Sequence, residues 1–181
     1  ATLQEGGPAA FALRATLAAT MSPLWGVYSG YELYEDRPVA EGSEEYHDSE
    51  KYQLRHRDFA AALAKGASLE PYLTLLNQIR RDNPALQQLR QIRFHDIAND
   101  QIIAYSKRVD AFHSPTGKDD VVLTVVNLDP HGARAGEVYL NLEALGLPGW
   151  VDASRPVVRV TDALTGDSYE WSGQNYVRLD P

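Results

Sequence analysis

The sequence predicts a mixed α and β fold, in which a helical first half is followed by an all-β second half. Apolar residues recur at helical spacing in segments before residue 83. From Ile92 onward apolar and polar residues alternate with the period of two that is typical of strands, and Gly, Asn, Asp and Pro turn signals separate the runs. A boundary is therefore expected near residue 90, with residues 1–90 and 91–181 as two parts.

The first helix is expected over residues 8–21. Pro8 suits a first helical turn, and Ser22-Pro23 ends the pattern. The apolar residues at helical spacing, which predict the buried face, are Phe11, Leu13, Leu17, Ala18 and Met21. A short buried strand is predicted over residues 25–28, where β-forming residues lie between a proline and a glycine.

Two further helices are expected after a long loop. Residues 35–57 show neither period and are rich in Glu, Asp, Ser and Tyr, and a loop of this length inside a compact domain is usually functional or disordered. Asp58 caps a short predicted helix over residues 59–65, and Ser68 caps a longer one that Asn83-Pro84 closes. The apolar stripe of the longer helix is Tyr72, Leu73, Leu76 and Ile79.

The second half contains seven predicted strands, over residues 92–95, 102–108, 121–127, 137–141, 157–161, 169–171 and 176–179. Short strands separated by turn signals at this spacing are typical of an antiparallel sandwich or barrel. The residues expected to be largely buried in it are Ile103, Val122, Val125, Leu140 and Val158.

Composition excludes several classes of function. The net charge of -8 argues against a nucleic-acid partner, because binding to phosphate backbones depends on clustered Lys and Arg. The absence of cysteine excludes disulfides and thiolate chemistry and fits a reducing cytoplasm. No apolar run approaches the roughly 20 residues of a membrane span, so no membrane partner is expected. The start at Ala1, without Met and directly before a helical pattern, suggests a piece of a longer chain.

No catalytic or metal-binding cluster is evident in the sequence. The five histidines are scattered without ligand spacing, so they are expected to be ordinary surface or loop residues, and no metal or other cofactor is predicted. The acidic pairs Glu44-Glu45 and Asp119-Asp120 are sequence neighbours, whose side chains point to opposite sides of an extended chain. Neither pair therefore supplies the two cooperating carboxylates that glycosidic chemistry uses.

The segment after the first helix has an unusual composition. Five of the ten tyrosines lie between residues 28 and 52, interleaved with Glu, Asp, Lys and Gln. Flat rings and short polar groups together suit a sugar, because rings cover pyranose faces and polar groups bind hydroxyls. The alternative is an ordinary solvated surface loop, which composition alone favours.

Several blocks of the sequence resemble one enzyme family. They are AAFALRATLAATM at residues 9–21, GVYSGYEL at 26–33, GSEEY at 42–46, SEKYQ at 49–53, LNQIRR at 76–81, NPALQ at 83–87 and TDALTG at 161–166. Together they resemble the C-terminal region of maltose 1-phosphate dependent α-1,4-glucan maltosyltransferases of the α-amylase superfamily. The NPAL block is common across the superfamily, whereas YSGYEL and SEKYQ are specific in combination.

The resemblance implies that residues 1–90 are the C-terminal piece of a (β/α)8 barrel and residues 91–181 a C-terminal β-sandwich. The first part would hold the seventh barrel helix, the eighth strand, an active-site loop and the last helix. The loop would face the substrate, because active sites of such barrels lie at the carboxyl ends of the strands. The catalytic nucleophile, acid/base and stabilising carboxylate of the family would all precede Ala1, so no catalytic residue is expected here.

By the same resemblance, Lys51 and Tyr52 match positions that bind hydroxyls of the donor sugar remote from the cleaved bond. Glu32 is expected to fasten the rim of the barrel. The implied substrates are maltose 1-phosphate as donor and an α-1,4-glucan as acceptor, and the implied partner is the remainder of the barrel. A homodimer stays open for the complete enzyme.

Two other classes stay open at this point: a related hydrolase or isomerase of the superfamily, and an independent carbohydrate-binding module. A binding module needs an exposed aromatic platform. Trp150 and Trp171 are the candidates, but tryptophans of sandwiches are commonly core residues, so both are expected to be buried.

Overall fold

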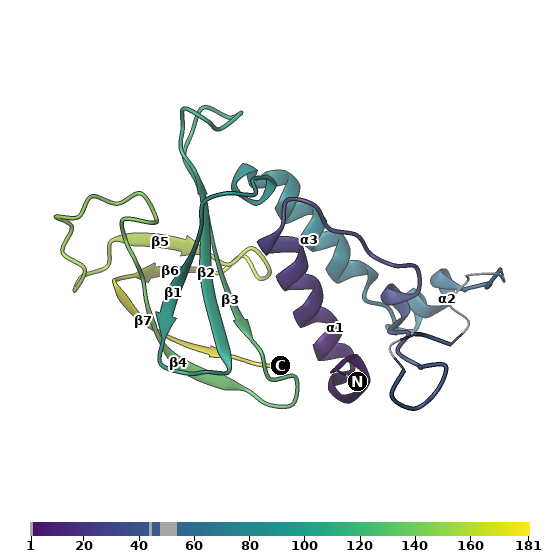
Figure 1. Ribbon diagram of the computed structural model, residues 1–181. Coiled ribbons are helices and arrows are strands. Elements are labelled where there is room, and N and C mark those ends of the chain that lie inside the picture. Colours follow the sequence, from purple (N-terminus) through teal and green to yellow (C-terminus); the bar gives the residue numbers. More distant parts are fainter. Residues whose placement is uncertain (1, 44, 48–53) are drawn as a thin grey trace.

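The helical half and the β half of the chain lie side by side (Figure 1). The computed structural model describes residues 2–43, 45–47 and 54–181. Five helical elements precede the strands: α1 (Thr2–Met21), η1 (Tyr31–Leu33), α2 (Phe59–Ala64), α3 (Glu70–Asp82) and η2 (Pro84–Gln87). The three predicted helices are therefore confirmed, as is the mixed α and β class.

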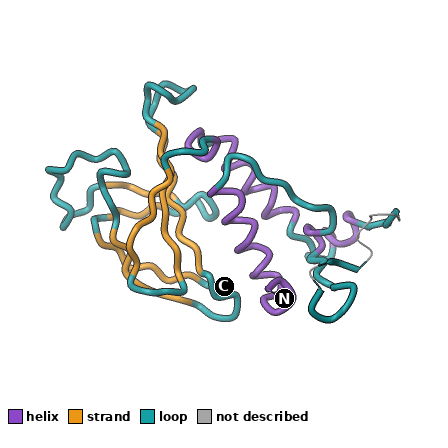
Figure 2. The backbone as a smooth tube through the Cα atoms, in the orientation of Figure 1, coloured by secondary structure: helices purple, strands orange, loops and turns teal. Residues whose placement is uncertain are grey.

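All strands from β1 onward are antiparallel, as predicted. They are β1 (Ile92–Ile97), β2 (Ile102–Val109), β3 (Asp120–Asn127), β4 (Arg134–Tyr139), β5 (Val158–Thr161), β6 (Ser168–Trp171) and β7 (Gln174–Leu179). The strands, drawn in orange in Figure 2, form a curled five-stranded sheet and a separate two-stranded pair. The order in the larger sheet is β3-β2-β1-β4-β7, and the pair consists of β5 and β6. The C-terminal strand β7 thus lies at the edge of the five-stranded sheet beside β4, whereas β6, which precedes it in sequence, belongs to the separate pair.

The core of the β half lies on the inner face of the five-stranded sheet. Its buried members are Ile102, Ala104, Val138, Leu140 and Val177, and Trp171 packs against them partly buried. Of the five residues predicted to be buried, Leu140 is buried, whereas Ile103, Val122, Val125 and Val158 are only partly buried. Ile103 and Val122 lie on the outer face of the sheet, because residues of a strand alternate between its two faces.

The buried face of α1 differs from the predicted one. Phe11, Ala15 and Ala19 are buried against Leu73 and Leu76 of α3, while Leu13 and Leu17 are only partly buried. Small side chains let the two helices approach closely, so the alanine stripe forms the contact. The helix also begins earlier than predicted and is kinked at Gly7, whose φ is 54°.

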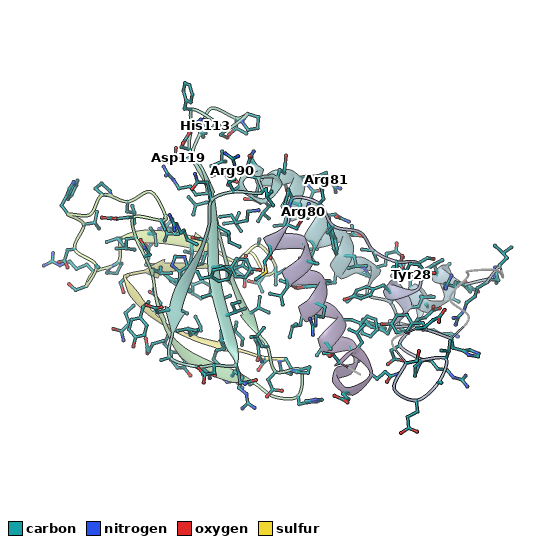
Figure 3. All side chains as sticks on the ribbon, viewed as in Figure 1. Tyr28, Arg80, Arg81, Arg90, His113 and Asp119 are labelled. Carbon is teal, nitrogen blue, oxygen red and sulfur yellow. The ribbon has the colours of Figure 1, made fainter. Side chains whose placement is uncertain are left out.

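Polar contacts join the helical half to the sheet. Buried Lys107 of β2 donates from Nζ to the carbonyl oxygens of Gln88 and Met21. Arg80 of α3, labelled in Figure 3, donates to the carbonyl oxygens of Ala19 and, at 2.8 Å, Ser22. These cations satisfy carbonyl groups that the end of α1 leaves without a partner within the helix.

Two expectations were wrong. Residues 24–28 form neither helix nor strand, because a strand needs a hydrogen-bonded neighbour and none of the described strands pairs with this segment. Trp150 is 85% exposed in the loop that follows β4, and Trp171 is only partly buried.

Candidate functional site

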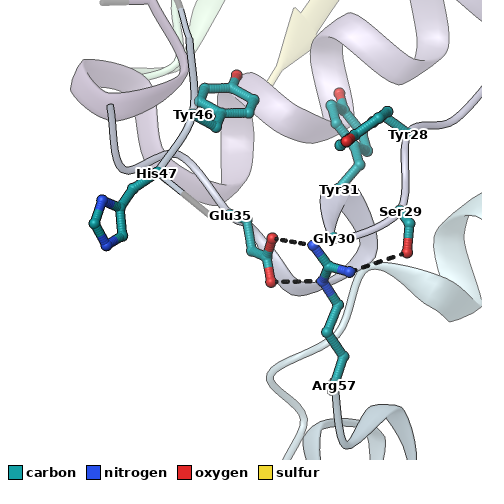
Figure 4. A pocket seen from close by; sticks show the side chains of 8 residues that line it. All are labelled: Tyr28, Ser29, Gly30, Tyr31, Glu35, Tyr46, His47 and Arg57. Carbon is teal, nitrogen blue, oxygen red and sulfur yellow. Dashed lines mark hydrogen bonds and ion pairs between the residues drawn. The ribbon is translucent and has the colours of Figure 1, made fainter. Parts of the chain in front are cut away.

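A small hollow lies where the segment after α1 meets the segment before α2. Its lining comes from residues 28–31, 35, 46, 47 and 57, which Figure 4 shows from close by. The lining residues are Tyr28, Ser29, Gly30, Tyr31, Glu35, Tyr46, His47 and Arg57. The hollow therefore combines three phenol rings with charged and hydroxyl groups.

Glu35 and Arg57, which both line this hollow, form an ion pair. Arg57 donates from Nε to Glu35 Oε1 at 2.9 Å and from Nη2 to Oε2 at 3.1 Å. The side chain of Arg57 is only 4% exposed and that of Glu35 20% exposed, and Arg55 adds a further contact to Oε1 at 3.3 Å. Two parallel hydrogen bonds fix both planes, so the pair holds residues 35 and 57 in one geometry.

Gly30 gives the ion pair its space. Its φ of 103° lies in the left-handed region, and a Cβ atom there would clash with Glu35 Oε2. The backbone N–H of Gly30 donates to Glu32 Oε2 at 2.9 Å, and the carbonyl oxygen of Glu32 accepts from the N–H of Leu69. Glu32 thus fastens this turn locally, and it does not line the hollow.

Tyr31 anchors the hollow to α1. Its hydroxyl donates to the carbonyl oxygen of Phe11 at 2.6 Å, and the two rings lie 4.8 Å apart. Burial raises the pKa of the Tyr31 phenol to about 12, and the nearby Tyr46 adds to this shift. The phenol therefore stays protonated at neutral pH and acts as a fixed donor rather than an acid or base.

A short hairpin supplies two further lining residues of the hollow. Pro38 pairs with Tyr46, and the N–H of His47 donates to the carbonyl oxygen of Arg37 at 2.8 Å. The hairpin contributes Tyr46 and His47 to the lining of the hollow.

The two predicted substrate-binding residues, Lys51 and Tyr52, lie outside the described residues, as does Glu44. The structure does place the residues on either side of them, because both His47 and Arg57 line the hollow.

The other polar candidates have structural contacts. Asp119 accepts from Arg108 Nη2 and from the N–H of Ala111, both at 2.7 Å, whereas Asp120 accepts from the N–H of Ala85 at 2.8 Å. The two neighbouring carboxylates thus serve different contacts, as their adjacency predicted. Across residues 2–43, 45–47 and 54–181 no group of three or more His, Asp or Glu side chains could hold a metal ion.

His95 is buried, contrary to the expectation that every histidine is a surface or loop residue. Its Nδ1 accepts from the N–H of Asn141 at 3.1 Å, so Nε2 carries the proton and donates to Ser106 Oγ at 2.9 Å. Burial lowers the pKa of His95, and Asp96 opposes this shift. The neutral ring therefore links β1, β2 and the loop after β4.

Sequence reasoning found the tyrosine-rich segment but missed the Glu35–Arg57 pair. The partners are 22 positions apart in a region without periodicity, so no local pattern indicated the contact. The GYEL turn was the available signal, since its glycine is the residue that makes room for the carboxylate.

The structure contains no helix, among the residues described, that is long and apolar enough to cross a membrane. Residues 94–181 match the family model described as GLGE, C-terminal. The whole chain is 61% identical to an alpha-1,4-glucan:maltose-1-phosphate maltosyltransferase of Corynebacterium glutamicum. It is also 56% identical to one of Mycolicibacterium smegmatis, in an alignment that covers 99% of the chain. These matches cover 25% and 24% of the two relatives, so the chain spans about a quarter of their length.

Proposed function

Since the chain is homologous over its whole length to α-1,4-glucan:maltose-1-phosphate maltosyltransferases, we propose that it is part of a protein with that activity. The protein would transfer maltosyl units from α-maltose 1-phosphate to the non-reducing end of an α-1,4-glucan. The observation that carries this proposal is the 61% identity across 181 residues, which includes the loops as well as the core.

The proposed reaction retains configuration and uses two carboxyl groups, one as nucleophile and one as acid/base. Both would lie in the part of the protein that precedes this chain. The carboxylates near the described hollow support this assignment, because Glu32 is held by Gly30 and Glu35 by Arg57. A carboxylate that accepts two hydrogen bonds from a buried guanidinium is engaged in a structural contact.

Residues 1–90 would then be the end of a (β/α)8 barrel, and residues 91–181 a β-sandwich beside it. Along the chain, α1 is followed by residues 24–31 and then by α3. This is the order that a barrel helix, a strand and a last helix require. In the complete barrel, residues 25–28 would gain neighbouring strands and with them the backbone hydrogen bonds that a strand needs. The lack of cysteine supports a reducing compartment such as the cytoplasm.

Lys51 and Tyr52 would bind the non-reducing-end glucose of the donor without taking part in bond cleavage. An ammonium group offers three donors and a phenol offers a hydroxyl and a ring face, which together suit a sugar. The Glu35–Arg57 pair supports this role, because it fixes Arg57, which follows these two residues in the sequence, at the hollow.

The test is steady-state kinetics of the complete protein with maltose 1-phosphate and a maltooligosaccharide acceptor. Lys51→Ala removes charged hydrogen bonds worth roughly 1.5–3 kcal/mol, so kcat/KM should fall about tenfold to a hundredfold while the fold is kept. Tyr52→Phe tests the hydroxyl apart from the ring. Glu41→Ala, an exposed change on the same segment, is the matched control. Wild-type kinetics in a folded Lys51→Ala, Tyr52→Phe double variant would refute the role of both residues.

The 181-residue chain by itself should be inactive, because its expected catalytic carboxylates lie upstream. Release of phosphate from maltose 1-phosphate by the purified chain, in the presence of α-glucan, would contradict the proposed division of roles.

A further inference from the structure

Three aromatic side chains form a row across the outer face of the five-stranded sheet. Phe94 lies on β1, Tyr139 on β4 and Tyr176 on β7, and they are 60%, 43% and 64% exposed. Their sequence neighbours His95, Val138 and Val177 are buried, so the rings occupy the face opposite the core. This set of three is called the aromatic row below.

Strand register places the three rings on one diagonal. Tyr139 is paired with Asp96, and Phe94 lies two positions before Asp96 on β1. Tyr139 is also paired with Gln174, and Tyr176 lies two positions further along β7 on the other side. Diagonal neighbours of this kind are about 7–8 Å apart. The row therefore crosses β1, β4 and β7 in a single line.

Polar side chains alternate with the rings along this line. Asp96 and Gln174 flank Tyr139 on either side, and Glu137 is paired with Tyr176. The amide of Gln174 donates to Glu137 Oε2 at 3.4 Å. The surface is thus built from flat apolar rings and carboxylate or amide groups, without an aliphatic side chain in the row.

The helical half covers a different part of the outer face of the five-stranded sheet from the one that carries the aromatic row. Tyr105 of β2 lies on this face and is buried, since its hydroxyl meets Thr20 of α1 at 2.5 Å. At the near end of the row, the ring of Phe94 lies 5.8 Å from that of Tyr105. Among the described residues, the helices thus end their cover at β2, and the aromatic row begins beside it.

We propose that the aromatic row on β1, β4 and β7 binds a chain of α-linked glucose residues. Rings stack on the apolar faces of the sugars, and Asp96, Glu137 and Gln174 accept or donate hydrogen bonds to their hydroxyls. The carboxylates favour a neutral, hydroxyl-rich ligand over a phosphate-bearing one, which they would repel. The choice of α-glucan as ligand rests on the proposed function.

The row and the hollow lie on different parts of the described chain. The row lies on strands of the β half, whereas the hollow is formed by residues 28–57 beside α1. A long glucan held on the row stays near the enzyme between transfers, because a second point of attachment raises its effective concentration. A short oligosaccharide would gain nothing from the row.

The test compares a long and a short ligand in the complete protein. The double variant Tyr139→Thr, Tyr176→Thr loses two aromatic rings, and threonine is a residue that favours strands. The dissociation constant for amylose, measured by calorimetry, should rise roughly tenfold, and kcat/KM with a short maltooligosaccharide acceptor should stay unchanged. The double variant Tyr139→Phe, Tyr176→Phe keeps both rings and should bind amylose nearly as well as the wild type. Tyr169→Thr, an exposed change on β6, is the matched control.

Three results would overturn the proposal. Unchanged amylose binding in the folded Thr double variant means that the row binds no glucan. A lower melting temperature with unchanged amylose binding means that the rest of the same protein packs on the row. A change in oligomeric state with unchanged amylose binding means that a second copy covers it. Row-dependent amylose binding by a wild-type protein without maltosyl transfer would instead refute the proposed function and leave this inference standing.

Discussion

Thr20 of α1 and Tyr105 of β2 lie 85 positions apart in the sequence and share a buried hydrogen bond of 2.5 Å between their hydroxyl oxygens. Thr20 also donates to the carbonyl oxygen of Thr16 at 2.6 Å, so Tyr105 donates to Thr20. Burial raises the pKa of the Tyr105 phenol, which keeps this donor protonated. The contact connects the helical half with the outer face of the sheet.

Tyr105→Phe should destabilise the 181-residue chain by about 0.5–1.5 kcal/mol, because Thr20 loses its donor while the ring and its packing remain. The measurement is urea unfolding followed by circular dichroism. Tyr169→Phe on β6, where the side chain is half exposed, should leave the unfolding midpoint unchanged. Equal midpoints for wild type and Tyr105→Phe would show that the hydrogen bond contributes nothing.

Gly30→Ala should be more harmful than Gly42→Ala. Both glycines have positive φ values, 103° and 77°, but a Cβ at Gly30 would meet Glu35 Oε2 whereas nothing lies near Gly42. The backbone cost alone is roughly 1–2 kcal/mol, and Gly30→Ala must also displace the Glu35–Arg57 pair. Thermal unfolding of both variants separates the two costs. Equal losses of stability would mean that the carboxylate moves aside freely.

Acidification should destabilise the chain through His95. Burial lowers its pKa in the folded state below the unfolded value of about 6.5, so the unfolded chain binds the proton first. The contribution of His95 is therefore complete above pH 6.5 and is lost as the pH falls toward its folded pKa. Free energies of unfolding at pH 7.5, 6.5 and 5.5 should show a smaller loss in His95→Gln than in wild type. The exposed His131→Gln control should keep the full loss.

Arg80→Lys should destabilise the chain by roughly 1–3 kcal/mol. The guanidinium bridges the carbonyl oxygens of Ala19, Ser22 and Pro23, and an ammonium group lacks the planar fork that reaches all three. Arg81→Lys is the control, because the neighbouring Arg81 is exposed and bonds only to Gln78 on its own helix. Chemical denaturation of the two variants measures the difference. A stability of Arg80→Lys equal to that of Arg81→Lys would contradict the bridging role.

The strands were more predictable than the packing. Each strand carries its period of two and is bounded by turn residues, which are local signals, and all seven were found within three residues of their predicted ends. The buried face of α1 was missed because helix contact favoured Ala15 and Ala19 over Leu17, and only the position of α3 decides this. The prediction of a strand at residues 25–28 was wrong for a related reason, since a strand forms only where another strand lies beside it to share hydrogen bonds.

The candidate site was predictable in location but not in construction. The density of tyrosines indicated the segment, and Tyr28, Tyr31 and Tyr46 do line the hollow. The link between Glu35 and Arg57 joins residues from two segments, and Trp150 is exposed where typical sandwiches bury a tryptophan. Neither fact has a signature in residue spacing, because both depend on which surfaces meet after folding.

The bridge from Arg80 to the end of α1 also has a consequence for the order of events during synthesis. The carbonyl oxygen of Ala19 receives its donor from a residue 61 positions later. At a translation rate of about 5–20 residues per second, the C-terminal turn of α1 waits roughly 3–12 s for Arg80 to be made. A nascent chain stalled before Arg80 should therefore carry a frayed α1 with an exposed alanine stripe, and chaperones that recognise unpaired helix surfaces should bind it during that interval.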